Sequence, residues 1–139
     1  MEISREFLDR HNRNNLYLAM GIKIEDALHG TAHSRMEIQS SLCWPFPQQP
    51  HGGVIFTLMD TTMIWALFSL LEQGLNCTTI QMDIQYLSPA KGRFVACTAW
   101  VADKTRRLGF ARGEVKDERS QLVALGQGTF RIIKTDIIE

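Results

Sequence analysis

Two features of this chain have the chemistry of a reactive site, and the first is His51-Gly52-Gly53. This tripeptide precedes a long apolar run, at the place where a helix would begin. Unpaired N–H groups at a helix start carry the positive end of the helix dipole, and they can stabilise a carbonyl oxygen that gains negative charge. Glycine lets a ligand approach such groups closely. The same glycines would also suit a helix start that serves packing alone, so both interpretations stay open.

The second feature is a carboxylate inside the apolar run. Asp60 follows His51 by nine residues, and its neighbours in sequence are apolar or carry hydroxyl groups. A buried carboxylate is costly unless it is paired, hydrogen-bonded or used. Asp60 is therefore either a structural residue bonded to Thr57, Thr61 or the backbone, or a nucleophile or general base that faces a cleft.

The spacing of Gly52 and Asp60 has a consequence for assembly. Eight residues of helix span roughly 12 Å, because each residue adds about 1.5 Å. The two groups therefore cannot touch one reacting carbonyl within a single chain. If both are catalytic, two chains must supply them, and the reaction requires a dimer with two equivalent sites at a two-fold interface.

The hydrophobic pattern predicts the helices that must position these residues. From Gly52 to about Gln73, apolar residues occupy nearly every side of a helical wheel, which predicts a long helix surrounded by protein that ends before Gly74. Residues 4–15 predict a short polar surface helix with Ser4 as its N-cap. Three prolines within 43–50 predict a loop.

The other segments predict a sheet. Strands are expected at 19–26, 30–39, 80–86, 94–101, 107–115 and 122–133, the first two joined near His29-Gly30. In the first strand after the helix, Ile80, Met82, Ile84 and Tyr86 alternate with polar residues, which predicts one wet face. Short turns between the last four strands predict an antiparallel meander. We expect one α+β domain over residues 1–139, a sheet curled around the apolar helix, with residues 1–16 as a short N-terminal helix or arm.

Composition excludes several classes of protein. The 139 residues are 45% hydrophobic and 22% charged, as in an ordinary globular domain. Fifteen Lys and Arg balance fifteen Asp and Glu, so no basic field is available to hold nucleic acid. Three cysteines with no C-x-x-C spacing argue against a disulfide scaffold or structural zinc, and favour the cytoplasm. The apolar stretch from Val54 to Leu71 contains Asp60, which favours a buried core helix over a membrane span.

The run His51-Gly-Gly-Val-Ile-Phe-Thr-Leu-Met-Asp60-Thr-Thr strongly resembles the helix start of hotdog-fold acyl-CoA thioesterases. A second segment, Ile84-Gln-Tyr-Leu-Ser-Pro-Ala-Lys91, is similar to the strand end and turn of the same family. The similarity covers roughly residues 18–133. The group that it most resembles is the PaaI-type (phenylacetate-degradation) branch, which is related to 4-hydroxybenzoyl-CoA thioesterases.

The resemblance implies roles for individual residues. Asp60 would be the catalytic carboxylate that attacks the thioester or activates water, and the Gly52 N–H would hold the thioester oxygen. His51 would orient the substrate carbonyl or the loop. Thr79 would assist the acid or its water, with Thr78 as the alternative if the strand register differs by one.

The resemblance also implies contacts to coenzyme A and reveals one departure. Guanidinium groups and lysines suit phosphate oxygens. The residues expected at the substrate and coenzyme A are Gly53, Lys91, Arg106 and Arg107. Many relatives carry Asn six residues before the histidine, where this chain has Pro45. Gln48, which we include in the catalytic set, or Gln49 could supply an amide of similar chemistry.

Three hypotheses for function follow. The leading one is a hotdog thioesterase, assembled as a homodimer and further as a dimer of dimers, that hydrolyses an acyl- or aryl-CoA thioester to the free acid and coenzyme A without metal or cofactor. An enoyl-thioester hydratase is less favoured, because its catalytic His and acid would stand at Pro45 and Leu58. The third is a non-catalytic acyl-CoA-binding or sensing protein, which the loss of Asn at Pro45 would permit.

Overall fold

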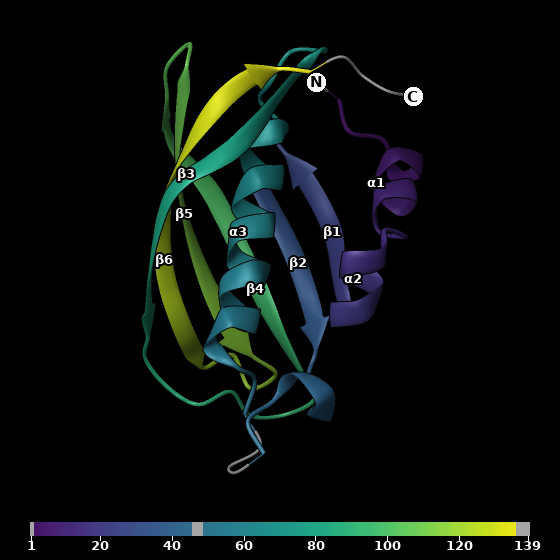
Figure 1. Ribbon diagram of the computed structural model, residues 1–139, viewed down its shortest axis with the longest axis vertical. Coiled ribbons are helices and arrows are strands. Elements are labelled where there is room, and N and C mark those ends of the chain that lie inside the picture. The colour runs from purple at the N-terminus through teal and green to yellow at the C-terminus, as the bar shows by residue number, and fades with distance from the viewer. Residues whose placement is uncertain (1, 46–48, 136–139) are drawn as a thin grey trace.

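Six antiparallel strands curl around one central helix in the computed structural model, which describes residues 2–45 and 49–135 (Figure 1). Two short helices lie beside the first strand. This is the α+β arrangement that the hydrophobic pattern predicts. In chain order the elements are α1 (Arg5–His11), α2 (Asn15–Met20), β1 (Ile22–Leu28), β2 (Thr31–Glu37), the 3-10 helix η1 (Ser40–Leu42), α3 (Gly52–Phe68), β3 (Leu75–Tyr86), β4 (Phe94–Lys104), β5 (Leu108–Asp117) and β6 (Leu122–Lys134).

Helix α3 supplies the centre of the hydrophobic core. Its side chains Leu58, Met59, Met63 and Leu67 are completely buried against the inner face of the sheet. Burial of each such side chain stabilises the fold by roughly 1.5–3 kcal/mol. Gly126 on β6 allows the close approach, because a Cβ atom there would collide with the sulfur of Met59.

One side of α3 remains open within the single chain. Phe56, Asp60 and Ile64 are only partly buried, and their i, i+4, i+8 spacing aligns them along the helix. We call this row the open stripe. In Figure 1 the helix lies between β3 on one side and α1 and α2 on the other. The sheet and the N-terminal helices thus cover most faces of α3, and Asp60 lies on the side that remains partly open.

Helix α3 is shorter than the apolar run predicts. The helix ends at Phe68 rather than Gln73, and Gly74, with φ +85°, lies beyond a further turn. The Ser69 hydroxyl donates to the Ala66 carbonyl and accepts the Gly30 N–H, which ties the helix end to the β1–β2 turn. Leu70 N–H then bonds to Leu67 O, an i to i−3 bond that tightens the chain and stops the α-helix.

The strand order differs from a simple meander. The sheet runs β1-β2-β4-β5-β6-β3, so β4, β5 and β6 are consecutive neighbours, whereas β3 lies beyond β6 at the far edge. Residues 87–93 carry the chain from that edge back to β4 beside β2. This segment is too long for a tight hairpin turn, and β6 offers β3 a partner of matching length. The expected pairing of β3 with β4 is wrong for that reason.

The N-terminal region contains two helices where one was expected. Helix α1 begins at Ser4, whose hydroxyl accepts the Phe7 N–H at 3.1 Å, as predicted. A second cap at Asn14 then begins α2, which continues to Met20 and ends at Gly21 with φ +69°. The first strand therefore starts at Ile22 rather than at residue 19, because the left-handed Gly21 changes the chain direction.

A β-bulge in β3 changes which side chains face inward. The register with β6 shifts between Thr79 and Gln81, and Ile80 is 56% exposed. The simple alternation groups Ile80 with Met82 and Ile84, and it is wrong for Ile80. A bulge adds a residue that has no partner and resets the alternation, so that Thr79 and Met82 can both lie on the helix side.

We predict that the three cysteines differ strongly in reactivity. Burial raises the pKa of the Cys97 thiol to about 12, and burial with the nearby Asp60 charge raises the pKa of Cys77 to about 12. A pKa about three units above the usual value lowers the thiolate fraction roughly a thousandfold at neutral pH. Iodoacetamide should therefore modify the partly exposed Cys43 first in the native protein, as read by mass spectrometry. Rapid native modification of Cys97 would contradict this, and unfolding in guanidinium chloride, the control, should expose all three.

Candidate functional site

Helix α3 begins with a cap that His51 provides. Its Nδ1 accepts the Gly53 N–H at 2.9 Å, so in neutral His51 the ring proton is on Nε2. The imidazole also stacks on the Trp44 ring, with centroids 4.8 Å apart and planes inclined by 27°. The Gly53 N–H is therefore engaged by His51, and the expected place of Gly53 at the substrate stays a prediction.

Gly52 offers the next N–H group of the helix start. Among residues 2–45 and 49–135, no group accepts a hydrogen bond from the Gly52 N–H. The Gly52 carbonyl accepts the Tyr86 hydroxyl at 2.6 Å, which joins the helix start to the end of β3. A Cβ atom on residue 52 would lie 3.1 Å from the Tyr86 ring, so glycine allows this close contact. Gly52 is thus placed to donate to a ligand oxygen.

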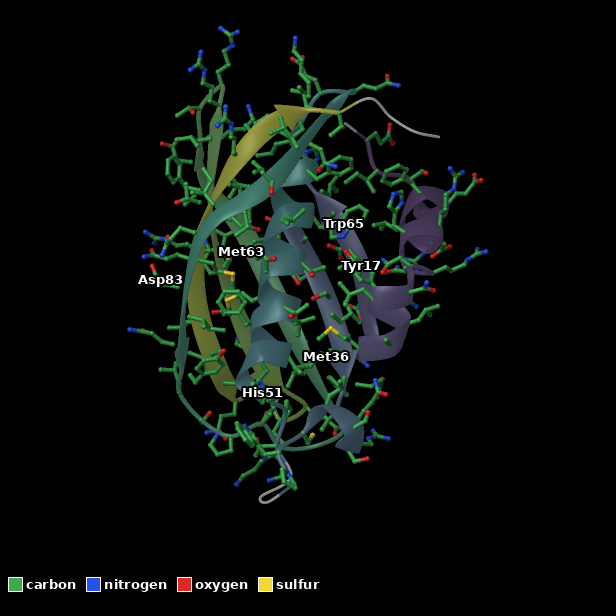
Figure 2. The ribbon with its side chains drawn as sticks, viewed as in Figure 1. Tyr17, Met36, His51, Met63, Trp65 and Asp83 are labelled. Atoms are coloured by element: carbon green, nitrogen blue, oxygen red, sulfur yellow. The ribbon has the colours of Figure 1, made fainter. Side chains whose placement is uncertain are left out.

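A cavity of about 400 Å³ lies beside this helix start. Its walls are largely apolar, and two of them are aromatic rings that remain half exposed, Trp44 at 54% and Tyr86 at 50%. Figure 2 shows His51 at this end of α3. The cavity is lined by Trp44, Gln49, Pro50, Gly52, Ile55, Tyr86, Leu87, Ser88, Pro89, Ala90 and Val123.

Gln49 holds the turn that closes this cavity. Its side-chain amide donates to the Ala90 carbonyl at 2.8 Å and accepts the Ala90 N–H at 2.7 Å. Both ends of the amide are therefore engaged with the backbone, and Gln49 positions the turn instead of presenting a free amide to a substrate. Gln48, the other candidate for the missing Asn, lies outside the described residues.

Asp117 anchors the same turn from the other side. The buried carboxylate accepts the Lys91 N–H at 3.0 Å and the N–H groups of Arg119 and Gln121. Burial raises the pKa of Asp117, but these backbone donors outweigh that effect and the pKa is lowered overall. Lys91, which follows Ala90 of the cavity lining, therefore has a fixed backbone and is exposed.

Asp60 and Thr79 form a second group on the open stripe. The Thr79 hydroxyl donates to Asp60 Oδ1 at 2.7 Å, whereas Thr78 is exposed. Among the described parts of the chain, Asp60 Oδ2 has no hydrogen-bond partner. Burial is the main cause of the raised pKa of Tyr17 on α2, and the Asp60 charge adds to it. The carboxylate thus lies between β3 and the N-terminal helices.

The structure keeps the predicted residues in separate groups. His51, Gly52 and Gly53 lie together at the helix start, and Asp60 with Thr79 lies about two helical turns away. Lys91 stands at the helix-start end. By contrast, Arg106 and Arg107 stand in the β4–β5 turn at the opposite end, beside a cavity of about 560 Å³ that Lys104 and Lys134 also line.

Two residues at the site had no assigned role in the sequence analysis. Tyr86 was expected only as a strand residue, although its hydroxyl holds the Gly52 carbonyl. Tyr86 lies in the segment that resembles the thioesterase strand end, and this resemblance could have identified it as a site residue. Trp44 lies next to the proline-rich run, and no local pattern relates it to His51.

Other expected or excluded chemistry can be examined in the same structure. Leu58, where a hydratase would carry its acid, is completely buried. Within residues 2–45 and 49–135, no three His, Cys, Asp or Glu side chains gather as metal ligands. No helix of this described part has the length and apolar character needed to cross a membrane. The cytoplasmic location stays a prediction.

Comparison with known proteins identifies the family. Residues 50–124 match the model of the Thioesterase superfamily. The chain is 30% identical over 142 residues to a proposed esterase of Halobacterium salinarum, an alignment that covers 95% of this chain and 91% of that protein. It is 33% identical over 81 residues to acyl-coenzyme A thioesterase 13 of Mus musculus, which is 57% of each chain.

A solved structure supports the same assignment. The PaaI protein from the phenylacetic acid degradation operon of E. coli superposes with a TM-score of 0.80 at 26% identity, covering 90% of this chain and 88% of that one. The curved sheet around one helix is the hotdog fold that the resemblance implied. The chain therefore belongs to the thioesterase superfamily, as an enzyme of the PaaI type.

Proposed function

We propose that this protein hydrolyses an acyl- or aryl-CoA thioester to the free acid and coenzyme A. The observation that carries the proposal is the Asp60 carboxylate, which lies on the open stripe of an otherwise apolar helix, with Oδ1 bound by Thr79 and Oδ2 available. The mouse relative is named an acyl-coenzyme A thioesterase, which supports this class of substrate.

The groups at the site suit both routes of thioester hydrolysis. As a general base, Asp60 takes a proton from water while the water oxygen adds to the carbonyl carbon, and the carbon–sulfur bond then breaks as the thiolate regains a proton. As a nucleophile, Asp60 adds to the carbonyl carbon and the carbon–sulfur bond breaks, so that coenzyme A leaves as the thiolate and takes up a proton; water then hydrolyses the mixed anhydride to the free acid and the Asp60 carboxylate. In both routes the carbonyl oxygen gains negative charge, which the Gly52 N–H, aided by His51 Nε2–H, would stabilise.

The helix start and Asp60 must come from two chains for this reaction. About 12 Å of helix separates Gly52 from Asp60. Strand β3 is a sheet edge, and its exposed Ile80 together with Phe56 and Ile64 of the open stripe forms an apolar rim around Asp60 that a second copy would cover. We place the two-fold axis at this edge, so that two β3 strands run antiparallel.

Antiparallel pairing of two β3 strands would also bring together groups that lie far apart within one chain. A two-fold axis places the Tyr86 end of one strand against the Leu75 end of its partner. Gly52, which is bonded to Tyr86, then approaches Asp60 of the partner subunit. Lys91 approaches the β4–β5 turn of the partner subunit in the same way, which would gather cations for the phosphates of one coenzyme A molecule.

The first prediction concerns Asp60. We expect Asp60→Asn to lower kcat at least about a hundredfold, since a general base or nucleophile contributes this much or more. Free-thiol release would be measured on acetyl-, hexanoyl-, palmitoyl-, phenylacetyl- and 4-hydroxybenzoyl-CoA. Asp26→Asn is the matched control, because Asp26 is exposed on β1, at the sheet edge opposite β3. Unchanged turnover in Asp60→Asn would contradict the catalytic role of Asp60. Binding of the thioesters without hydrolysis by the wild type would favour the acyl-CoA-binding alternative.

A second prediction concerns the hydroxyl on Asp60. Thr79→Val keeps the shape of the side chain and removes the donor to Oδ1. Loss of one hydrogen bond to a charged group should lower kcat about tenfold, with little change in the thermal midpoint. Thr78→Val is the control because Thr78 is exposed. Equal effects of the two substitutions would show that the Thr79 hydroxyl has no specific part in turnover.

A third prediction tests whether one site uses two chains. Gly52→Pro removes the N–H group, and the extended backbone of His51, with ψ 140°, suits a following proline. Gly52→Ala is the control, because it places the same Cβ atom beside the Tyr86 ring but keeps the N–H. Gly52→Pro and Asp60→Asn should each be inactive alone. Refolded together in equal amounts they should regain about a quarter of the wild-type activity, because half of the dimers are mixed and each has one intact site. No regain, in a mixture that native mass spectrometry shows to contain mixed dimers, would contradict the shared site.

A further inference from the structure

The orientation of the His51 imidazole requires more support than its single hydrogen bond. His51 is exposed at the helix start, and Nδ1 accepts only the Gly53 N–H. A hydrogen bond at one ring atom selects which nitrogen faces the helix, but it leaves the plane of the ring free to swing. Small misplacements of a group that meets the reacting carbonyl lower turnover considerably. A second contact must therefore hold the plane of the ring.

Trp44 provides this second contact. Its ring stacks on the imidazole at 4.8 Å with the planes inclined by 27°, which restricts the imidazole to one plane. The stack and the hydrogen bond together define one orientation, with Nδ1 on Gly53 and Nε2–H on the opposite edge of the ring. That proton is then available to a ligand oxygen near the Gly52 N–H.

The backbone on either side of Trp44 is itself firmly held. The Trp44 N–H bonds to the Gln49 carbonyl at 2.7 Å, and Cys43 forms a β-bridge with Pro50. The His51 N–H bonds to the Leu42 carbonyl at 2.9 Å. These contacts bring the two ends of the proline-rich segment together, so that Trp44 faces His51 although seven positions separate them in the chain.

Core packing does not explain why a tryptophan stands at this position. Trp44 is 54% exposed, and it is not a member of the buried hydrophobic core. One face of the ring meets His51, and the side chain also lines the cavity of about 400 Å³ beside Gly52. A large half-exposed aromatic ring on a fixed loop beside a site residue points to a role in the site.

We propose that Trp44 is a positioning residue for thioester hydrolysis, which holds His51 so that its Nε2–H meets the thioester oxygen together with the Gly52 N–H. This inference rests on the proposed function. It assigns a task to a residue that lies outside the His51-to-Asp60 run, and it explains how the chain can orient its histidine with Pro45 at the position of the usual Asn.

Kinetics of three variants test the proposal. Trp44→Ala should lower kcat about tenfold and change KM less than twofold, because the histidine loses its fixed plane. Trp44→Phe keeps an aromatic face and should stay within about threefold of the wild type. Trp100→Ala is the matched control, since Trp100 is only partly buried and lines a different cavity of about 690 Å³ on the outer face of the sheet. An increase in KM alone for Trp44→Ala would mean that Trp44 contacts the substrate, and would overturn the proposal.

A double substitution separates positioning from a general structural effect. In a His51→Ala background, Trp44→Ala should cost less than about twofold further in kcat, since its partner is already absent. The same tenfold loss in both backgrounds would overturn the proposal. Thermal midpoints of all variants would be measured alongside, so that a fold defect is recognised as such.

A spectroscopic measurement tests the positioning without any turnover. NMR relaxation of the His51 ring C–H bonds should report a fixed ring plane in the wild type and in Trp44→Phe, and a mobile ring in Trp44→Ala, because the stack and not the Gly53 hydrogen bond holds the plane. Equal ring mobility in the wild type and Trp44→Ala would overturn the proposal. A wild type that hydrolyses no thioester would overturn the proposed function, and the relaxation result would still decide whether Trp44 orients His51.

Discussion

One constraint shapes most of this molecule: its central helix is apolar almost all round but carries a carboxylate. The sheet buries the apolar sides of α3, with Leu58, Met59 and Met63 fully enclosed. It cannot enclose Asp60 in the same way, because a buried charge without partners is too costly. The open stripe resolves this conflict by leaving Asp60 partly exposed and bonded to Thr79. Phe56 and Ile64, the apolar neighbours of Asp60 on this stripe, stay only partly buried in the single chain as a consequence.

Strand β3 positions groups both beside Asp60 and at the start of α3. Its bulge turns Ile80 outward at the edge and leaves Thr79 on the side of Asp60. Its last residue, Tyr86, bonds to the Gly52 carbonyl and so joins the strand to the helix start. One strand therefore contacts both Asp60 and the helix start, and a shift of register along it would disturb both contacts together.

The helix start depends on a set of contacts that close around it. Gln49 pairs with both backbone groups of Ala90, and Asp117 holds the next N–H group, of Lys91. His51 caps the helix and rests on Trp44. The hydrogen bonds of these side chains go to backbone groups of the loop, and the Gly52 N–H stays available to a ligand. The rigidity of the loop is thus a condition for presenting a single donor to a ligand.

The sequence by itself determined the central helix, the strands and the chemical candidates of this protein. The all-round apolar run predicted α3, the period of two predicted the strands, and the conspicuous residues His51, Gly52 and Asp60 follow from local pattern and cost of burial. Only the tertiary structure decided that β3 pairs with β6, that α3 ends at Phe68, that Thr79 rather than Thr78 meets Asp60, and that Trp44 stacks on His51. The physical reason is that periodicity reports the environment of each residue along one segment. Strand partners, bulges and ring stacks depend instead on the competing contact energies of segments that are distant in the chain and meet only when it folds.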